Sequence, residues 1–117
     1  MKIDWIYMRG GCTSCDKAKE VLRAKNIESI TEVDCKRTPL DGAALKVALQ
    51  DLDTVWITKG KKVLRFTPPQ DESEILALAL GRSGNLRAPS IRHGRKFLVG
   101  YTNELYPELV DGLLRNR

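Results

Sequence analysis

Residues 3–22 read IDWIYMRGGCTSCDKAKEVL, and the pattern changes at the centre of this stretch. Residues 3–8 are mostly apolar and aromatic and end at Arg9-Gly10-Gly11, which predicts a β-strand followed by a loop. From Cys12 onward the apolar side chains recur about one helical turn apart with charged side chains between them, and Asn26 is a suitable end for the helix. We therefore expect a strand, a loop and a helix, with a C-x-x-C motif where the loop enters the helix.

The rest of the chain extends this start into an α/β fold. Residues 29–33 predict a second strand, which the strand–helix–strand order makes parallel to the first. The further elements expected are a helix entered at residues 38–41, a helix over 71–80 closed by Gly81, short strands at 88–92 and 95–100, and a last helix. Residues 54–66 are expected to form a hairpin, although a short helix end followed by a loop also fits them. This order is that of a thioredoxin-like fold, a glutaredoxin-type mixed sheet flanked by helices, with a helical insertion before its second half.

Details of the last third of the chain are also predicted. Thr102 or Asn103 is expected to cap the last helix, with Pro107 in its first turn. Apolar residues of that helix are expected to face inward: Leu105, Leu109, Val110, Leu113 and Leu114. His93 falls in a glycine-containing turn and is expected at the surface, without a catalytic role.

Composition limits the classes of protein to consider. The 117 residues suit one domain over 1–117, and 42% hydrophobic with 30% charged residues argues against disorder. No apolar run is long enough to span a bilayer, and the N-terminus is typical of a strand rather than a signal peptide, so we expect a cytoplasmic protein that does not bind membranes. The net charge of +5 suits a small anionic substrate or an acidic partner and does not indicate direct nucleic-acid binding.

The Cys12–Cys15 motif carries the chemistry. Free N–H groups and the dipole at a helix start stabilise a thiolate, so Cys12 is the expected nucleophile and Cys15 the resolving thiol. Thr13 and Ser14 are candidate hydroxyl donors to a substrate, and Arg9 and Lys17 add positive charge nearby.

Other interpretations of the cysteines stay open. A zinc site would need Cys35 and His93 as further ligands, and neither shows paired ligand spacing, so no metal is expected. Two ordinary buried cysteines are a second alternative. Cys35 itself is either a core or near-surface thiol without a redox role, an alternate resolving thiol or a site of glutathionylation.

Two residues of the C-terminal half are candidates for substrate binding. Pro89 precedes a predicted strand, and in a thioredoxin-like fold a cis-proline at this place faces the cysteines and leaves backbone groups free for an incoming chain. Arg87 is the candidate for holding an oxyanion by two hydrogen bonds near the cysteines. A run of basic residues near 59–65 is expected only to solvate an exposed turn.

Two blocks of sequence resemble the arsenate reductase/Spx-like (ArsC-like) family of the thioredoxin superfamily. They are Tyr7 to Leu22, with CTSCDKAKEVL, and NLRAPSI at 85–91 continuing through FLVGYTNE at 97–104. The resemblance implies a thioredoxin-like domain with Cys12 as the reactive thiol and Pro89 as the cis-proline. The Cys-Thr-Ser-Cys motif is more similar to the Spx-type branch than to glutathione-linked arsenate reductases, which typically keep only the first cysteine. The chain has Ala88 where the family has arginine, and the shift of that arginine to position 87 reverses its direction in an extended segment.

The sequence therefore predicts a thiol–disulfide oxidoreductase without a cofactor, with arsenate, another small oxyanion or a protein disulfide as substrate. Thioredoxin or a glutathione/glutaredoxin system is the expected electron donor. Cys12→Ser should abolish activity, and Cys15→Ser should trap mixed disulfides. The alternative is a redox-sensing binding protein of the Spx type that contacts RNA polymerase.

Overall fold

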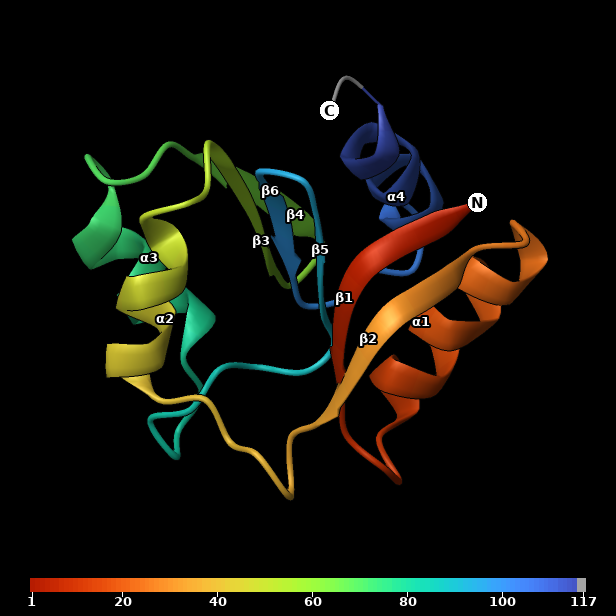
Figure 1. Ribbon diagram of the computed structural model, residues 1–117, viewed down its shortest axis with the longest axis horizontal. Helices are drawn as coiled ribbons and strands as arrows, with labels where there is room; N and C mark the ends of the chain where they lie inside the picture. The colour runs from red at the N-terminus through yellow and green to blue at the C-terminus, as the bar shows by residue number, and fades with distance from the viewer. Residues whose placement is uncertain (116–117) are drawn as a thin grey trace.

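The expected strand–loop–helix–strand unit forms at the N-terminus of the computed structural model, which describes residues 1–115 (Figure 1). Strand β1 (Lys2–Met8) leads through a loop into helix α1 (Thr13–Ala24), and strand β2 (Glu28–Asp34) returns beside β1. The two strands are parallel, with Met8 opposite Asp34, as predicted. Asn26 has a φ of 57°, a left-handed conformation that asparagine tolerates, and the chain reverses there.

The middle of the chain adds two helices and a hairpin. Helix α2 (Gly42–Leu49) begins after Asp41, whose carboxylate accepts the N–H of Ala44 and caps the helix. Strands β3 (Thr54–Lys59) and β4 (Lys62–Phe66) form the predicted antiparallel hairpin. Helix α3 (Glu72–Ala79) follows and ends just before Gly81.

The C-terminal elements are β5 (Ser90–His93), β6 (Lys96–Val99) and α4 (Tyr106–Leu114). The predicted start of the last helix was wrong: Leu105 occupies the cap position, without a side-chain cap, and the Thr102 carbonyl accepts the N–H of Tyr106. Leu105 is also 37% exposed instead of facing inward, while Val110 and Leu113 are buried. The turn at 103–105 brings Tyr106, absent from the expected inward set, into the core.

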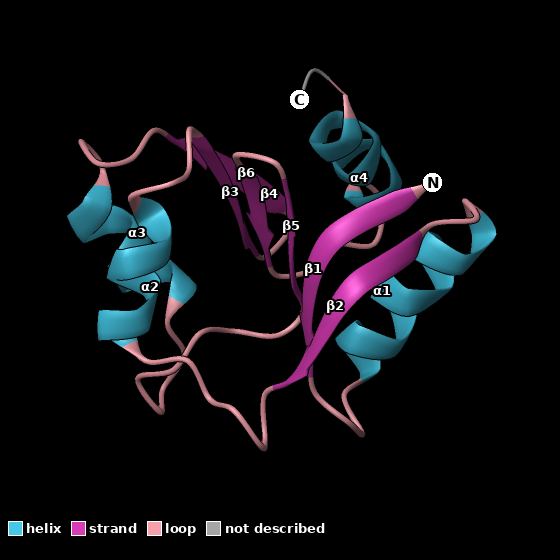
Figure 2. Ribbon diagram, in the orientation of Figure 1, coloured by secondary structure: helices cyan, strands magenta, loops and turns pink. Residues whose placement is uncertain are grey.

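All six strands form one mixed sheet in the order β2-β1-β5-β6-β3-β4 (Figure 2). β6 runs parallel to β3, so the hairpin extends the sheet beyond the β2-β1-β5-β6 unit. Helices α1 and α4 pack on one face of the sheet in one apolar cluster, and α2 and α3 pack with the other face in a second cluster. Such burial on both faces stabilises a sheet with parallel pairs.

The sheet carries the cysteine motif at one end. β1 and β2 both run toward it, and the loop from Arg9 to Cys12 follows β1 at that end. None of the helices within residues 1–115 has the length and apolar character needed to cross a membrane.

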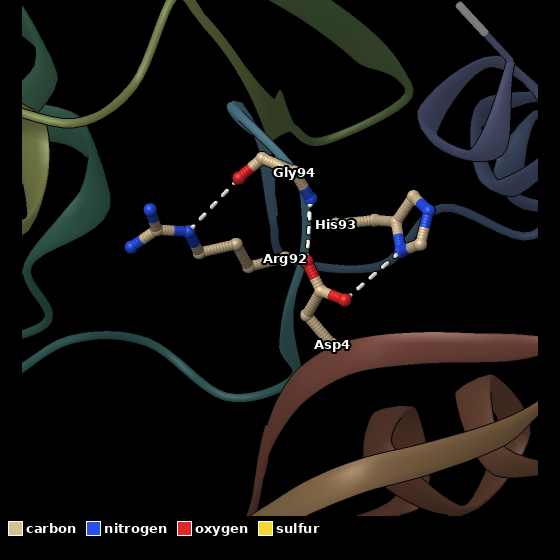
Figure 3. A network of polar contacts seen from close by, with 4 residues as sticks. All are labelled: Asp4, Arg92, His93 and Gly94. Atoms are coloured by element: carbon tan, nitrogen blue, oxygen red, sulfur yellow. Dashed lines mark hydrogen bonds and ion pairs between the residues drawn. The ribbon is translucent and has the colours of Figure 1, made fainter. Parts of the chain in front are cut away.

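His93 is buried, whereas the sequence predicted it at the surface. It is the last residue of β5, is only 8% exposed, and its Nδ1 lies 3.5 Å from the Asp4 carboxylate of β1 (Figure 3). The other Asp4 oxygen accepts the N–H of Gly94 at 2.7 Å, and the Arg92 Nε–H donates to the Gly94 carbonyl on the other side of the turn. The turn is thereby fastened to β1, so the sequence pattern of a free surface turn was misleading.

Candidate functional site

Cys12 is placed at the entrance of α1 by the loop that leaves β1. It is the N-cap residue of the helix, and its Sγ accepts the N–H of Cys15 at 3.4 Å. This is a free N–H of the first helical turn, the kind of donor that favours a negatively charged sulfur, and the helix dipole adds to it. The thiol is half-buried, so a substrate can approach it.

Cys15 lies behind Cys12, on the core side of the helix. It is 1% exposed, and its Sγ accepts the N–H of Arg9 at 3.4 Å. Burial raises the pKa of the Cys15 thiol to about 12, and its contact with Cys12 acts in the same direction. Both cysteines are free thiols. The fold thus places an accessible sulfur in front of a sheltered sulfur.

Cys12 opens into a pocket of about 570 Å³ at this end of the sheet. Its lining comes from segments far apart in the chain, including Tyr7 of β1, Cys35 after β2, and the loop before β5. Four lining residues are basic and none carries a carboxylate; the basic ones are Arg9, Lys36, Arg82 and Arg87. Positive charge beside the sulfur favours both thiolates and anionic ligands.

Cys35 lies in the same pocket. It follows the last residue of β2, and its N–H donates to the Met8 carbonyl at 2.8 Å, which continues the β1–β2 pairing by one residue. The thiol is half-buried, and burial raises its pKa while the charge of Arg9 opposes that rise. Cys35 is therefore neither a core residue nor a freely exposed one.

The Ala88–Pro89 peptide bond is cis, as the family resemblance implies. Pro89 is buried, and its carbonyl accepts the N–H of Gly100 at 2.8 Å. Ala88, the residue before it, lines the pocket and packs against the apolar cluster that also contacts Cys12. Within residues 1–115, no hydrogen bond engages the N–H or the carbonyl of Ala88.

Arg87 corrects the expectation of an oxyanion-binding guanidinium. Its Nη1 donates to the carbonyls of Thr58 and Leu78, at 3.0 and 3.1 Å, and its Nη2 donates to the Thr58 hydroxyl at 3.2 Å. Burial lowers the pKa of this guanidinium. Arg87 contributes to the pocket wall, but three of its five N–H donors hold the loop before β5 to β3 and α3. The reversal of direction noted at this position explains the difference.

Thr13 and Ser14 do not line the pocket of Cys12. Thr13 is exposed as the first residue of α1, and Ser14 is half-buried in a second pocket of about 370 Å³. The second pocket also contains Lys17 of α1 and Lys61 of the β3–β4 turn. No local sequence signal places that turn near the cysteines, because only the β6–β3 pairing brings it there.

Tyr106 is a neighbour of Cys15 that the sequence did not single out. Its side chain is fully buried in the same apolar cluster, and burial with a contribution from Cys15 raises the pKa of its phenol. Its hydroxyl has no hydrogen-bond partner among the described residues. The ring lies 4.7 Å from that of Tyr101, centre to centre.

Metal binding is not supported by the arrangement of ligands. Across residues 1–115, no three or more His, Cys, Asp or Glu side chains are grouped so that they could hold a metal ion. His93 lies beside Asp4, with its Nδ1 3.5 Å from the carboxylate, and is not grouped with the cysteines among residues 1–115, so the Cys₃His alternative has no structural basis.

Comparisons with known proteins give no family for this chain. No protein-family model matches it, and no curated protein matches it.

Proposed function

We propose that this chain is a thiol–disulfide oxidoreductase with a thioredoxin-like fold, related to the arsenate reductase/Spx-like family. The observation that carries the proposal is the pair at the start of α1. The Cys12 sulfur accepts a helix N–H at the mouth of a basic pocket, with Cys15 sheltered behind it.

The chemistry is thiol–disulfide exchange. The Cys12 thiolate attacks one sulfur of a substrate disulfide, forms a mixed disulfide and releases the other sulfur as a thiolate. Cys15 then attacks the Cys12 sulfur while its proton passes to the departing substrate sulfur, which leaves as a thiol, and a Cys12–Cys15 disulfide remains. An external dithiol or thiol, such as thioredoxin or glutathione, returns both cysteines to the reduced state.

The high pKa of Cys15 gives the two thiols different roles. A thiol with a pKa of about 12 stays protonated and unreactive near neutral pH. Cys12 is the more accessible sulfur and has the helix N–H beside it. The first attack on substrate therefore belongs to Cys12, and Cys15 acts only on the sulfur next to it.

The order of elements supports the thioredoxin-like assignment. β1, α1 and β2 form one half, β5, β6 and α4 form the other, and the four strands are adjacent as β2-β1-β5-β6. The cis-proline directly precedes β5, and the cysteines lie at the start of α1. The unpaired backbone of Ala88 in the pocket wall suits an extended substrate segment, which pairs by main-chain hydrogen bonds.

A protein or peptide disulfide is favoured over arsenate as substrate. Three of the five N–H donors of Arg87 already serve Thr58 and Leu78, so the guanidinium has fewer donors left for an oxyanion than the sequence suggested. The redox-sensing alternative and its contact with RNA polymerase stay predictions.

A single-turnover assay tests the proposal. The reduced protein is mixed with a peptide that contains one intramolecular disulfide, and the release of peptide thiol is followed in the wild type, Cys12→Ser and Cys35→Ser. We expect Cys12→Ser to lose at least about a hundredfold in rate and Cys35→Ser to stay close to wild type, because only Cys12 has the helix N–H on its sulfur. Equal rates in Cys12→Ser and wild type would contradict the proposal.

Trapping the mixed disulfide at Cys12 needs a variant in which no other cysteine can attack it. Because Cys35 shares the pocket with Cys12, the Cys15→Ser/Cys35→Ser double variant should accumulate the mixed disulfide with substrate at Cys12. Intact-mass measurement after acid quenching detects this adduct. Its absence from the double variant would show that Cys12 does not make the first attack.

A further inference from the structure

The first turn of α1 lies between two pockets, and both have basic walls. On one side the pocket of Cys12 is lined by Arg9, Lys36 and Arg82, besides the internally bonded Arg87. On the other side the pocket of Ser14 is lined by Lys17 and Lys61. These five cations come from the loop after β1, α1, the segment after β2, the β3–β4 turn and the loop after α3, and the fold gathers them in two pockets beside the first turn of α1.

The charges of these five side chains are accessible to a ligand. Arg9, Lys17, Lys36, Lys61 and Arg82 are exposed, and none of them takes part in an ion pair among residues 1–115. Elsewhere the protein pairs several of its surface cations, as in Lys19–Glu32, Lys25–Asp111 and Arg95–Asp53. Other exposed cations, such as Arg23 and Lys46, also lack an ion pair among residues 1–115, so what distinguishes the five is their place around the two pockets.

Few acidic groups oppose them. Glu104 is the single carboxylate in the described linings of the two pockets. Asp16 and Asp34 are close in sequence but belong to neither lining, and one Asp34 oxygen already accepts the N–H of Lys36. A cleft with one sign of charge concentrates ligands of the opposite sign.

The positions of the two pockets, on either side of one turn, suit an extended ligand. A small oxyanion would occupy one pocket, whereas an occupant that reaches both must pass over the turn that carries Cys12 to Cys15. The free N–H and carbonyl of Ala88 lie in the wall of the first pocket, where an extended chain can pair with them.

We propose that the face around Cys12 docks an acidic polypeptide segment, extended across both pockets, whose cysteine or disulfide is brought to Cys12. Aspartate and glutamate side chains on either side of the substrate cysteine meet Arg9, Lys36 and Arg82 in one pocket and Lys17 and Lys61 in the other. The redox step is the exchange already described, so this inference rests on the proposed function and names its substrate class.

Two readouts separate the docking surface from the redox activity. The first is the single-turnover rate with three disulfide peptides of equal length, in which the residues flanking the cysteines are glutamate, glutamine or lysine. The second is binding of fluorescein-labelled, cysteine-free peptides of the same three kinds to the Cys12→Ser variant, followed by anisotropy. Binding does not require exchange, so it tests the surface even if no peptide is reduced.

The matched variants change the same total charge at different places. Lys36→Glu/Lys61→Glu reverses one cation in each pocket. Arg23→Glu/Lys46→Glu reverses two exposed, unpaired cations in the last turns of α1 and α2, outside both linings. A general effect of net charge would be the same in the two double variants.

The glutamate peptide should react and bind at least about tenfold better than the lysine peptide at low salt, and about 0.5 M NaCl should remove most of the difference. Lys36→Glu/Lys61→Glu should abolish or invert this preference, and Arg23→Glu/Lys46→Glu should keep it. Equal rates and equal binding for the three peptides would overturn the docking surface and leave the proposed function standing. Charge-selective binding without reduction of any peptide would support the surface and contradict the oxidoreductase.

Two competitors decide the class of ligand. A cysteine-free glutamate peptide should inhibit the reaction with the glutamate disulfide peptide, and it should do so more strongly than an oligothymidylate of equal charge. Stronger inhibition by the oligonucleotide would overturn the inference in favour of nucleic acid. Glutathione disulfide is tested as a competing substrate. If it is reduced as fast as the glutamate peptide, and if Lys61→Glu does not slow its reduction, the inference of an extended ligand is overturned in favour of a small anion in one pocket.

Discussion

Cys12 and Cys15 stand three residues apart in the sequence, yet they meet different surroundings. Cys12 caps the helix and opens to the pocket, whereas Cys15 is 1% exposed in the core beside Tyr106. The same local geometry therefore produces one accessible thiol and one that is held neutral by burial. This difference has measurable consequences for single residues.

The stability of the reduced protein should fall at alkaline pH. The pKa of Cys15 is about 12 in the folded protein against an ordinary value of 9.0, so between these values the unfolded chain has lost this proton and the folded chain keeps it. Folding thus becomes less favourable from about pH 9 upward, by up to about 1.4 kcal/mol per pH unit for this group. Urea denaturation with reductant from about pH 8 to about pH 11 measures the slope.

Other buried groups act in the same direction, so the comparison needs a variant. Cys35, Tyr7 and Tyr106 also have raised pKa values. The Cys15→Ala variant keeps the loss of stability at alkaline pH that comes from Cys35, Tyr7 and Tyr106 but lacks the part that comes from Cys15. Its free energy of unfolding should therefore fall less steeply with pH than that of the wild type. An unchanged slope would show that Cys15 does not have a raised pKa in the folded protein.

Removing the Tyr106 hydroxyl should not destabilise the protein. A buried hydroxyl without a partner costs about 1–3 kcal/mol, and Tyr106→Phe removes it while keeping the ring. We expect the free energy of unfolding to stay the same or rise by about 1 kcal/mol, measured by urea denaturation at neutral pH. A loss above about 1 kcal/mol would mean that the hydroxyl makes a stabilising hydrogen bond.

At the scale of elements, the loop before β5 is held in place by a contact between three segments. Arg87 bonds Thr58 of β3 and Leu78 of α3, and Gly100 after β6 lies against both the Thr58 hydroxyl and the Arg87 guanidinium. Since Ala88 lies between Arg87 and the cis-proline, this contact positions the pocket wall that faces Cys12.

Gly100→Ala should disrupt this contact. Gly100 has a φ of 89°, and a Cβ there would lie 2.7 Å from the Arg87 Nη2 and closer still to the Thr58 hydroxyl. We expect a loss of about 2–4 kcal/mol in the free energy of unfolding. Gly60→Ala is the matched control, because Gly60 has a φ of 62° and a Cβ added there would meet no atom within 4 Å, so it carries the backbone cost alone. Equal losses in the two variants would contradict the packing described for Gly100.

For the molecule as a whole, the sequence determined the local elements better than the contacts between them. The change from strand to helix pattern at Cys12 and the turn glycines Gly60 and Gly94 are local signals, and the predicted elements formed there. The hydrogen-bond partners of Arg87 and the burial of His93 depend on which strands and helices lie opposite, and periodicity contains no such information. The positions of the basic residues are a case of the same kind. Lys36 and Arg82 line the pocket of Cys12 and Lys61 lines the neighbouring pocket of Ser14, and the order of the sheet brings these distant segments together.

The most direct test of the central claim is to map the disulfide formed when the reduced protein is oxidised with one equivalent of a small disulfide and quenched with an alkylating agent. Peptide mass analysis should find Cys12 linked to Cys15 in the major product and alkylated Cys35. A product in which Cys15 is alkylated while Cys12 is bonded to Cys35, or in which Cys12 and Cys15 both remain reduced, would contradict the account.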